Sequence, residues 1–229
     1  MNNRWRSNWK DLSGWRFRLG VLLTVMLAAS VTRSFWLMKI GQSLTCTEQV
    51  SRSDVIVVEN LDPDYLLFER AASVHKAGFA RRVLVPVQVS HESAQWNAAA
   101  IRIAELQAQM AQIPAPEIIP IRANEPISLN ISYKLRDFLI REHVRSIMVV
   151  TSAFRSKRSS LIYDAVMVPA GIAVACVPVF TGAGPQNWSQ SWHGIEEVTQ
   201  QLLKLQFYRF YVLWNIKPAQ VPTRADQTN

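Results

Sequence analysis

The sequence predicts an α/β protein: a Rossmann-like three-layer domain with a mainly parallel, five-stranded sheet, preceded by one N-terminal transmembrane helix. Three observations lead to this prediction. An apolar run at residues 19–38 follows a basic flank. Short β-branched runs then alternate with segments of helical periodicity over residues 54–214. Hydrophobic residues make up 49% of the 229 residues, which excludes a disordered chain.

The first element is the apolar run. As a helix, residues 19–38 would span roughly 30 Å, the thickness of a bilayer's hydrocarbon core. Arg33 lies near the end of this run, where its side chain can snorkel to the interface. We therefore predict a signal-anchor at 19–38. A signal peptide cleaved near Ala28-Ala29-Ser30 is the alternative.

The distribution of charge predicts the topology. Residues 1–40 hold seven of the 25 Lys and Arg and one acid, a net of +6, which leaves +2 for the rest of the chain. A basic segment at 1–18 places the N-terminus in the cytoplasm and the domain on the extracytoplasmic (periplasmic) side of the inner, cytoplasmic membrane, as a single-pass protein. The nearly neutral domain argues against nucleic acid as a partner.

Strands and helices alternate after the anchor. The strands are expected at 54–59, 82–89, 117–121, 146–150 and 172–177, and the helices at 64–76, 93–112, 128–143, 156–167 and 195–214. A linker at 39–53 precedes this domain (54–214), and a disordered tail (215–229) follows it. The alternation predicts parallel pairing with the first strand in the centre, and ligands then bind beyond the carboxyl ends of the strands.

A basic segment opens the helix after the fourth strand. Arg155, Lys157 and Arg158 follow Thr151-Ser152, and cations in a first helical turn oppose the helix dipole. We predict that Arg155, Arg158 and the two hydroxyls bind an anion such as a phosphate. The alternative is that nearby acids neutralise these cations.

Acidic residues follow the first two strands. Glu59 and Asn60 end the first strand, and Glu92 follows the second, so Glu59 and Glu92 are candidates for acid/base catalysis. Asp62 or Asp64 is expected to cap the next helix. The sequence has neither a dinucleotide fingerprint nor a Walker loop, and its Cys and His spacing suggests no metal, so no cofactor is expected.

Two further features leave alternatives open. Cys46 and Cys176 are expected as separate thiols, although a bridge is the alternative in an oxidising compartment. The last helix ends in aromatic residues that are expected to pack in the core rather than to touch the membrane surface. They are Phe207, Tyr208, Phe210, Tyr211 and Trp214.

Several segments resemble the SanA/ElyC/YdcF-like family of bacterial envelope proteins. They are SDVIVV (53–58), ERAA (69–72) with Ala77-Gly78, SLN (128–130), VVTSAFRSKRS (149–159), and Glu197 with Lys204-Leu205 and Tyr208. The resemblance implies a Rossmann-like fold over residues 54–211 and adds Arg70, Ser128 and Asn130 to the binding site.

The chain departs from the family pattern at its turns. Glu59-Asn60-Leu61 and Pro86-Val87-Gln88 stand where the family carries glycine-rich turns, and Arg155 stands where it carries histidine. Fold and location therefore transfer better than activity. The expected function is binding or processing of an anionic, phosphorylated envelope glycan or lipid-carrier intermediate in cell-wall or exopolysaccharide biogenesis. The alternative is a non-catalytic, anchored scaffold of envelope assembly.

Overall fold

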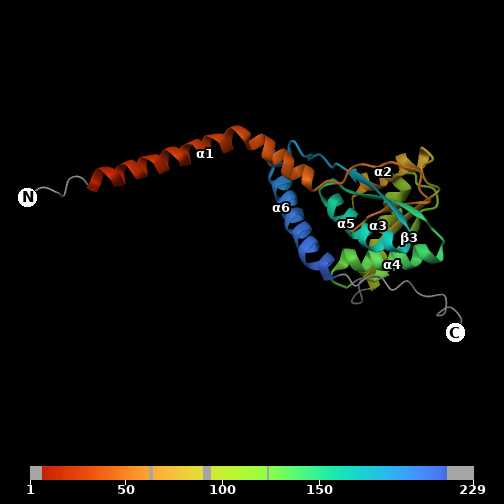
Figure 1. Ribbon diagram of the computed structural model, residues 1–229. Coiled ribbons are helices and arrows are strands. Elements are labelled where there is room, and N and C mark those ends of the chain that lie inside the picture. Colours follow the sequence, from red (N-terminus) through yellow and green to blue (C-terminus); the bar gives the residue numbers. More distant parts are fainter. Residues whose placement is uncertain (1–6, 62–63, 90–93, 123, 216–229) are drawn as a thin grey trace, which may run out of the picture.

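The computed structural model describes residues 7–61, 64–89, 94–122 and 124–215. A long helix, α1 (Ser7–Ser43), leads into an α/β domain (Figure 1). The strands are β1 (Val55–Val58), β2 (Arg82–Val89), β3 (Glu117–Arg122), β4 (Ser146–Ser152) and β5 (Ala173–Val179). The helices are α2 (Tyr65–Lys76), α3 (Ala94–Met110), α4 (Ile127–Arg141), α5 (Ala153–Met167) and α6 (Trp192–Phe207). Short 3₁₀ or π turns include η1 (Val168–Ala170), η2 (Trp188–Gln190), η3 (Tyr208–Val212) and η4 (Leu213–Asn215).

The five strands form one parallel sheet in the order β3-β2-β1-β4-β5, with β1 in the centre, as predicted. Val57 pairs with Val149 and Val58 with Val150, so β1 is paired with β4 up to its last residue. Strand β4 continues beyond this point through Ser152. The strand order reverses between β1 and β4. Ligands of such sheets bind at the carboxyl ends of the strands at this switch point.

Alternate residues of the strands face two separate cores. On one face, Ile56 and Val58 pack with α2 and α3 through residues such as Phe68 and Ala104. On the other, Val55 and Val57 pack with α4 and α5. Burial of both faces explains why the strand sequences are almost continuously apolar. The three-layer α/β prediction is confirmed.

Helix α1 has the length and composition of a membrane span over Gly14–Ser43, and its apolar 18-residue window is not buried by the rest of the molecule. Its last turns, however, belong to the domain. Leu44 is buried, and Leu37 and Ile40 pack with it against Trp188. The Trp188 indole N–H also donates to the Leu37 carbonyl at 2.9 Å. The prediction of a linker from residue 39 is therefore wrong over its first residues, because apolar side chains there pack on the domain.

The segment after α1 is joined covalently to the sheet. Cys46 and Cys176 form a disulfide, so the expectation of separate thiols was wrong. The Cys46 N–H donates to Ser156 Oγ at 2.8 Å, and the Leu44 carbonyl accepts from the Lys157 N–H at 3.0 Å. These contacts bring the two cysteines together, which their separation in the sequence could not show. They also fasten the end of α1 to the first turns of α5.

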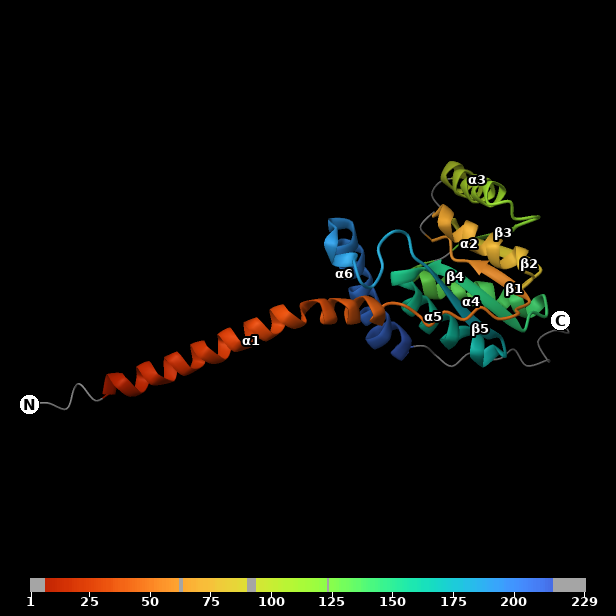
Figure 2. The same cartoon turned by 90° about the horizontal axis from the view of Figure 1, so that it is seen from above.

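Helix α6 packs crosswise at the end of α1, on the side of the domain from which α1 arrives (Figures 1 and 2). It buries Val198, Leu205 and, in the following turn, Tyr208. The expectation that its terminal aromatic residues pack in the core holds for Tyr208 alone. Phe207, Phe210, Tyr211 and Trp214 are exposed, because they lie away from the buried stripe of the helix.

Candidate functional site

The predicted site residues gather mainly where β1 and β4 end. Glu59 follows β1, and its N–H donates to the Val150 carbonyl of β4 at 2.9 Å. Thr151 and Ser152 end β4, and α5 begins at once with Ala153. The helix therefore starts three residues earlier than the predicted Ser156. As a result, Arg155 and Arg158 occupy its first two turns, directly beyond the sheet's switch point.

Glu59 is the centre of a buried polar cluster. Its side chain is 2% exposed, and Oε2 accepts hydrogen bonds from Thr151 Oγ1 and Ser159 Oγ, each at 2.5 Å. Thr151 is thus engaged with Glu59 rather than pointing to solvent. The Glu59 carboxylate lies where its charge raises the pKa of Arg155.

The two arginines are nearly as buried as Glu59, with Arg155 7% and Arg158 6% exposed. Arg158 donates to Ser128 Oγ at 3.2 Å and to Gln201 Oε1 at 3.4 Å, and its guanidinium lies 5.2 Å from the centre of the Tyr208 ring. Its Nε–H is buried without a hydrogen-bond partner among the described residues. A buried donor of this kind is costly unless a ligand or water satisfies it.

Both arginines line one cavity of about 350 Å³ between α4, α5 and α6, which we call the arginine cavity. Its wall combines three cations with one acid, two further polar side chains and an apolar rim. The lining residues are Leu61, Gln88, Glu125, Ile127, Ser128, Arg155, Arg158, Lys204, Phe207 and Tyr208. Glu59 is not among them. The cavity can therefore receive an anion, whereas the candidate base Glu59 lies in the protein interior.

The cations of this cavity disfavour one another's charge. Burial lowers the pKa of Arg155; Glu59 and Glu197 raise it, while Arg158 lowers it. Burial also lowers the pKa of Lys204, and so do Arg158 and Arg155. Burial raises the pKa of Glu197, which lies beside Ser152 and Arg155. Glu125 raises the pKa of Lys204, but the acids do not reverse the downward shift at either cation. An anion in the cavity would favour the charged forms of Arg155 and Lys204.

Asn60 lines a second cavity of about 280 Å³ with Trp96 and Asn97 of α3. Leu61 and Gln88 line both cavities, so the two adjoin. Asn60 is buried, and its Oδ1 accepts no hydrogen bond from the described part of the chain. The unsatisfied Asn60 Oδ1 suits a ligand with a hydroxyl or amide donor.

The remaining predicted residues have other contacts. Arg70 forms an ion pair with Glu48 at 2.6 Å and does not line the arginine cavity. Asn130 donates to the Asn124 and Pro126 carbonyls, where it secures the start of α4. Ser152 donates to Glu197 at 3.4 Å. Asp64 caps α2, as expected, by accepting from the Leu66 N–H. Glu92 and Asp62 lie outside the described residues.

Sequence reasoning missed Lys204 and Gln201 as members of the site. Both lie on α6, more than forty residues beyond Arg158, and only the packing of α6 on α5 brings them to the arginines. The resemblance quoted Lys204 within an end-helix pattern without giving it a role. Its position one turn before Tyr208, which flanks Arg158, is the signal that would have suggested one.

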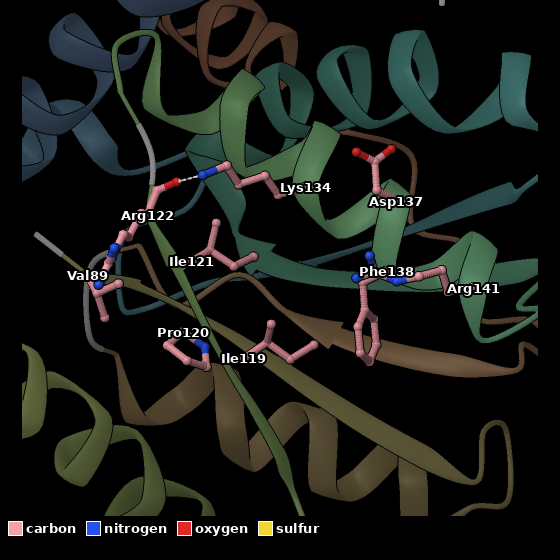
Figure 3. A pocket seen from close by; sticks show the side chains of 9 residues that line it. All are labelled: Val89, Ile119, Pro120, Ile121, Arg122, Lys134, Asp137, Phe138 and Arg141. Atoms are coloured by element: carbon pink, nitrogen blue, oxygen red, sulfur yellow. Dashed lines mark hydrogen bonds between the residues drawn. The ribbon is translucent and has the colours of Figure 1, made fainter. Parts of the chain in front are cut away.

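A larger groove of about 570 Å³ lies beside the edge strand β3, against α4. Figure 3 shows Phe138 and Arg141 on the helix opposite Ile119 and Pro120, and Lys134 donating to the Arg122 carbonyl. None of the predicted site residues lines it. Within the described ranges, no group of three or more His, Cys, Asp or Glu side chains is arranged to hold a metal ion.

Known proteins add no further constraint on the site. No protein-family model matches the chain, and no curated protein is significantly similar to it.

Proposed function

We propose that the chain is a membrane-anchored domain outside the cytoplasm that binds an anionic, phosphorylated envelope glycan or lipid-carrier intermediate. The observation that carries this proposal is the convergence of Arg155, Arg158 and Lys204 on one cavity at the carboxyl end of the sheet. Guanidinium groups next to the first turn of a helix are a common arrangement for phosphate binding.

The adjoining cavity suggests how such a ligand would lie. A phosphate near Arg158 would leave an attached sugar next to Asn60 and Gln88, whose amides can exchange hydrogen bonds with hydroxyl groups. The amides and the indole of Trp96 together form a polar and aromatic wall. This arrangement favours a phosphorylated, hydroxylated ligand over a simple inorganic anion.

Two features support a location outside the cytoplasm. Helix α1 is apolar enough to cross a bilayer, and the basic residues precede its apolar part. The Cys46–Cys176 disulfide is typical of an oxidising compartment. We also propose that the chain belongs to the SanA/ElyC/YdcF-like family of the bacterial envelope. This part of the proposal is supported by the sequence segments quoted above and by the parallel sheet.

A scaffold without catalysis is the second candidate. It is favoured by the placement of Glu59, which is buried in hydrogen bonds to Thr151 and Ser159 and does not line the cavity. A general base must reach the proton that it removes. We therefore propose binding as the function of the cavity and assign no reaction to it.

The test is a phosphate titration of the full chain in detergent, with melting temperatures measured in parallel. Replacement of Arg155 or Arg158 by Ala removes a charge-assisted hydrogen bond of about 1.5–3 kcal/mol and should weaken phosphate binding roughly ten- to a hundredfold. Arg70→Ala is the matched control, since its partner is Glu48, and should leave affinity unchanged. A loss of melting temperature with unaltered affinity in the Arg155 and Arg158 variants would favour the scaffold.

A further inference from the structure

The end of α6 presents an apolar surface that the domain does not cover. Leu203, Phe207, Phe210 and Trp214, which we call the aromatic face, are all at least half exposed, and Phe210 and Trp214 are 72% and 85% exposed. They recur every three or four residues, opposite the buried stripe of Val198, Gln201, Leu205, Tyr208 and Val212. Large apolar side chains gathered on one helix face indicate an interaction surface.

The anchor determines what lies opposite this face. Leu37, near the end of the apolar run, is already in contact with Trp188, and Leu44 is buried in the domain. Helix α1 continues from Met38, the end of the predicted span, to Ser43. At about 1.5 Å per residue, these last turns hold the domain within roughly 10 Å of the end of the span. A continuous helix leaves no flexible linker through which the domain could move away.

The views of the molecule place α6 on the side of the domain that is nearest to the apolar part of α1. In both, α6 lies on the side of the domain from which α1 arrives, and it runs across the direction of α1 (Figures 1 and 2). A helix that runs across a membrane-spanning helix lies along the plane of the bilayer. Since the buried stripe of α6 faces the domain, the aromatic face is directed away from it, toward the plane that α1 crosses.

The composition of α6 suits the headgroup region of a bilayer. Trp and Phe are typical of the apolar side of interfacial helices, and Lys204 and Arg209 provide cations for anionic headgroups. Phe207 belongs to both the aromatic face and the lining of the arginine cavity, next to Lys204 and Tyr208. The cavity is therefore lined by the same helix that carries the aromatic face.

We propose that the aromatic face rests in the headgroup region of the bilayer that α1 crosses, and that the arginine cavity takes the phosphate of a lipid-linked ligand whose apolar chain stays in that bilayer. The inference rests on the anchoring and phosphate binding proposed above. It narrows the ligand from any phosphorylated envelope intermediate to one that is still attached to its lipid.

The first test measures the depth of the aromatic face. The native cysteines form a disulfide, so Phe210→Cys or Trp214→Cys provides a single thiol for a spin label in the full chain. Nanodiscs of phosphatidylethanolamine and phosphatidylglycerol that hold one chain each prevent a second copy from covering the face. Both labels should collide more with oxygen and less with a water-soluble nickel chelate than a label at Met110→Cys, an exposed position of α3. Equal nickel accessibility at all three positions would overturn the proposal.

The second test separates the lipid from the phosphate. A Phe210→Ser, Trp214→Ser double variant should bind a prenyl monophosphate in nanodiscs about tenfold more weakly, a loss of about 1.4 kcal/mol, and bind inorganic phosphate as the wild type does. No loss for the prenyl phosphate, or equal losses for both ligands, would contradict a lipid-linked ligand. If the labels on the Cys variants are protected but the wild-type chain binds neither inorganic phosphate nor the prenyl phosphate, the membrane contact is supported and the proposed phosphate binding is refuted.

Discussion

The start of α5 and the end of α6 are neighbours with opposite distributions of polarity. The first turns of α5 bury Arg155, Ser156 and Arg158, whereas Phe207 at the end of α6 and Phe210 in the following η3 turn are exposed. Charged side chains are seldom buried, and a group of large apolar side chains is seldom left on the surface. Both regions therefore depart from the rule that governs the rest of the domain.

The comparison shows that the two regions need different partners. The buried arginines of α5 have partners inside the protein: the charge of Glu59 favours the charged form of Arg155, and Ser128 and Gln201 accept hydrogen bonds from Arg158. Both arginines also line a cavity that can hold an anion. The side chains of the aromatic face are not covered in this way by the described part of the chain, so an external apolar surface would have to cover them. An anion suits the first region and a bilayer the second. Phe207 and Lys204 belong to α6 and also line the cavity, so the two regions adjoin.

The largest expected effect concerns what holds the α5 region in place. The Cys46–Cys176 disulfide closes a loop with a sequence separation of 130. The backbone N–H of Cys46 also donates a hydrogen bond to Ser156 Oγ of α5. Removal of the disulfide in a Cys46→Ser, Cys176→Ser variant should cost about 2–5 kcal/mol of unfolding free energy. Phosphate affinity should fall as well, because the segment that hydrogen-bonds to Ser156 and Lys157 of α5 is then no longer joined covalently to the sheet. Denaturant unfolding and phosphate titration of the full chain in detergent measure both quantities.

The same variant tests the difference between the two regions. The aromatic face is not attached through this disulfide, so a spin label at Phe210 should keep its depth in the bilayer. An unchanged unfolding free energy would show that the hydrogen bonds around Ser156 suffice without the bridge.

A smaller effect is expected from Glu59. Glu59→Gln keeps the size of the side chain but removes the charge that accepts hydrogen bonds from Thr151 and Ser159. We expect a loss of about 1–3 kcal/mol in unfolding free energy. Phosphate should bind more tightly, since an anion near the cavity is gone. Thermal unfolding measures the loss of stability, and phosphate titration measures the gain in affinity.

Asp137→Asn serves as the control for this change, because Asp137 is an acid of the separate groove beside β3. It should alter neither quantity appreciably. Weaker phosphate binding in Glu59→Gln would mean that Glu59 positions Arg155 and does not merely balance its charge.

The smallest effect is a proton linkage at Lys204. Burial, Arg158 and Arg155 lower the pKa of Lys204 from its ordinary value of 10.5. In the free protein, the folded state therefore binds fewer protons at this site than the unfolded state, and stability rises with pH from the folded pKa up to about 10.5. A bound phosphate favours the charged amine, so binding in that alkaline range should take up protons.

Calorimetry in two buffers of different ionisation enthalpy measures this uptake. Lys204→Gln should abolish it while Arg158 still binds phosphate. An uptake that persists in Lys204→Gln would assign the titration to another group of the cavity.

Much of the domain could be predicted from local patterns. The run of β-branched residues at 55–58 and the alternation with helices led to a parallel sheet with β1 in its centre, which the structure shows. The position of Arg155 and Arg158 after β4 led to a site at the carboxyl end of the sheet. The prediction of the sheet succeeds because strand burial and βαβ connection depend on short segments and their order.

Other features could not be predicted in this way. The sequence suggested Arg70 as a partner of Arg155, yet Arg70 contacts Glu48, and Lys204 takes a place in the cavity wall instead. Which cations meet depends on how α2 and α6 pack against the sheet. The disulfide has the same origin, because the packing of the end of α1 on α5 places Cys46 next to Cys176.

By itself, the amino-acid sequence determined the apolar span, the fold class and the place of the basic helix start, since each is encoded within one segment. Only the tertiary structure decided that Glu59 is buried, that α6 completes the arginine cavity, and that Phe210 and Trp214 face outward. The physical reason is that a helix's apolar residues specify which of its faces seek burial, whereas the docking of one helix on another decides which of them obtain it.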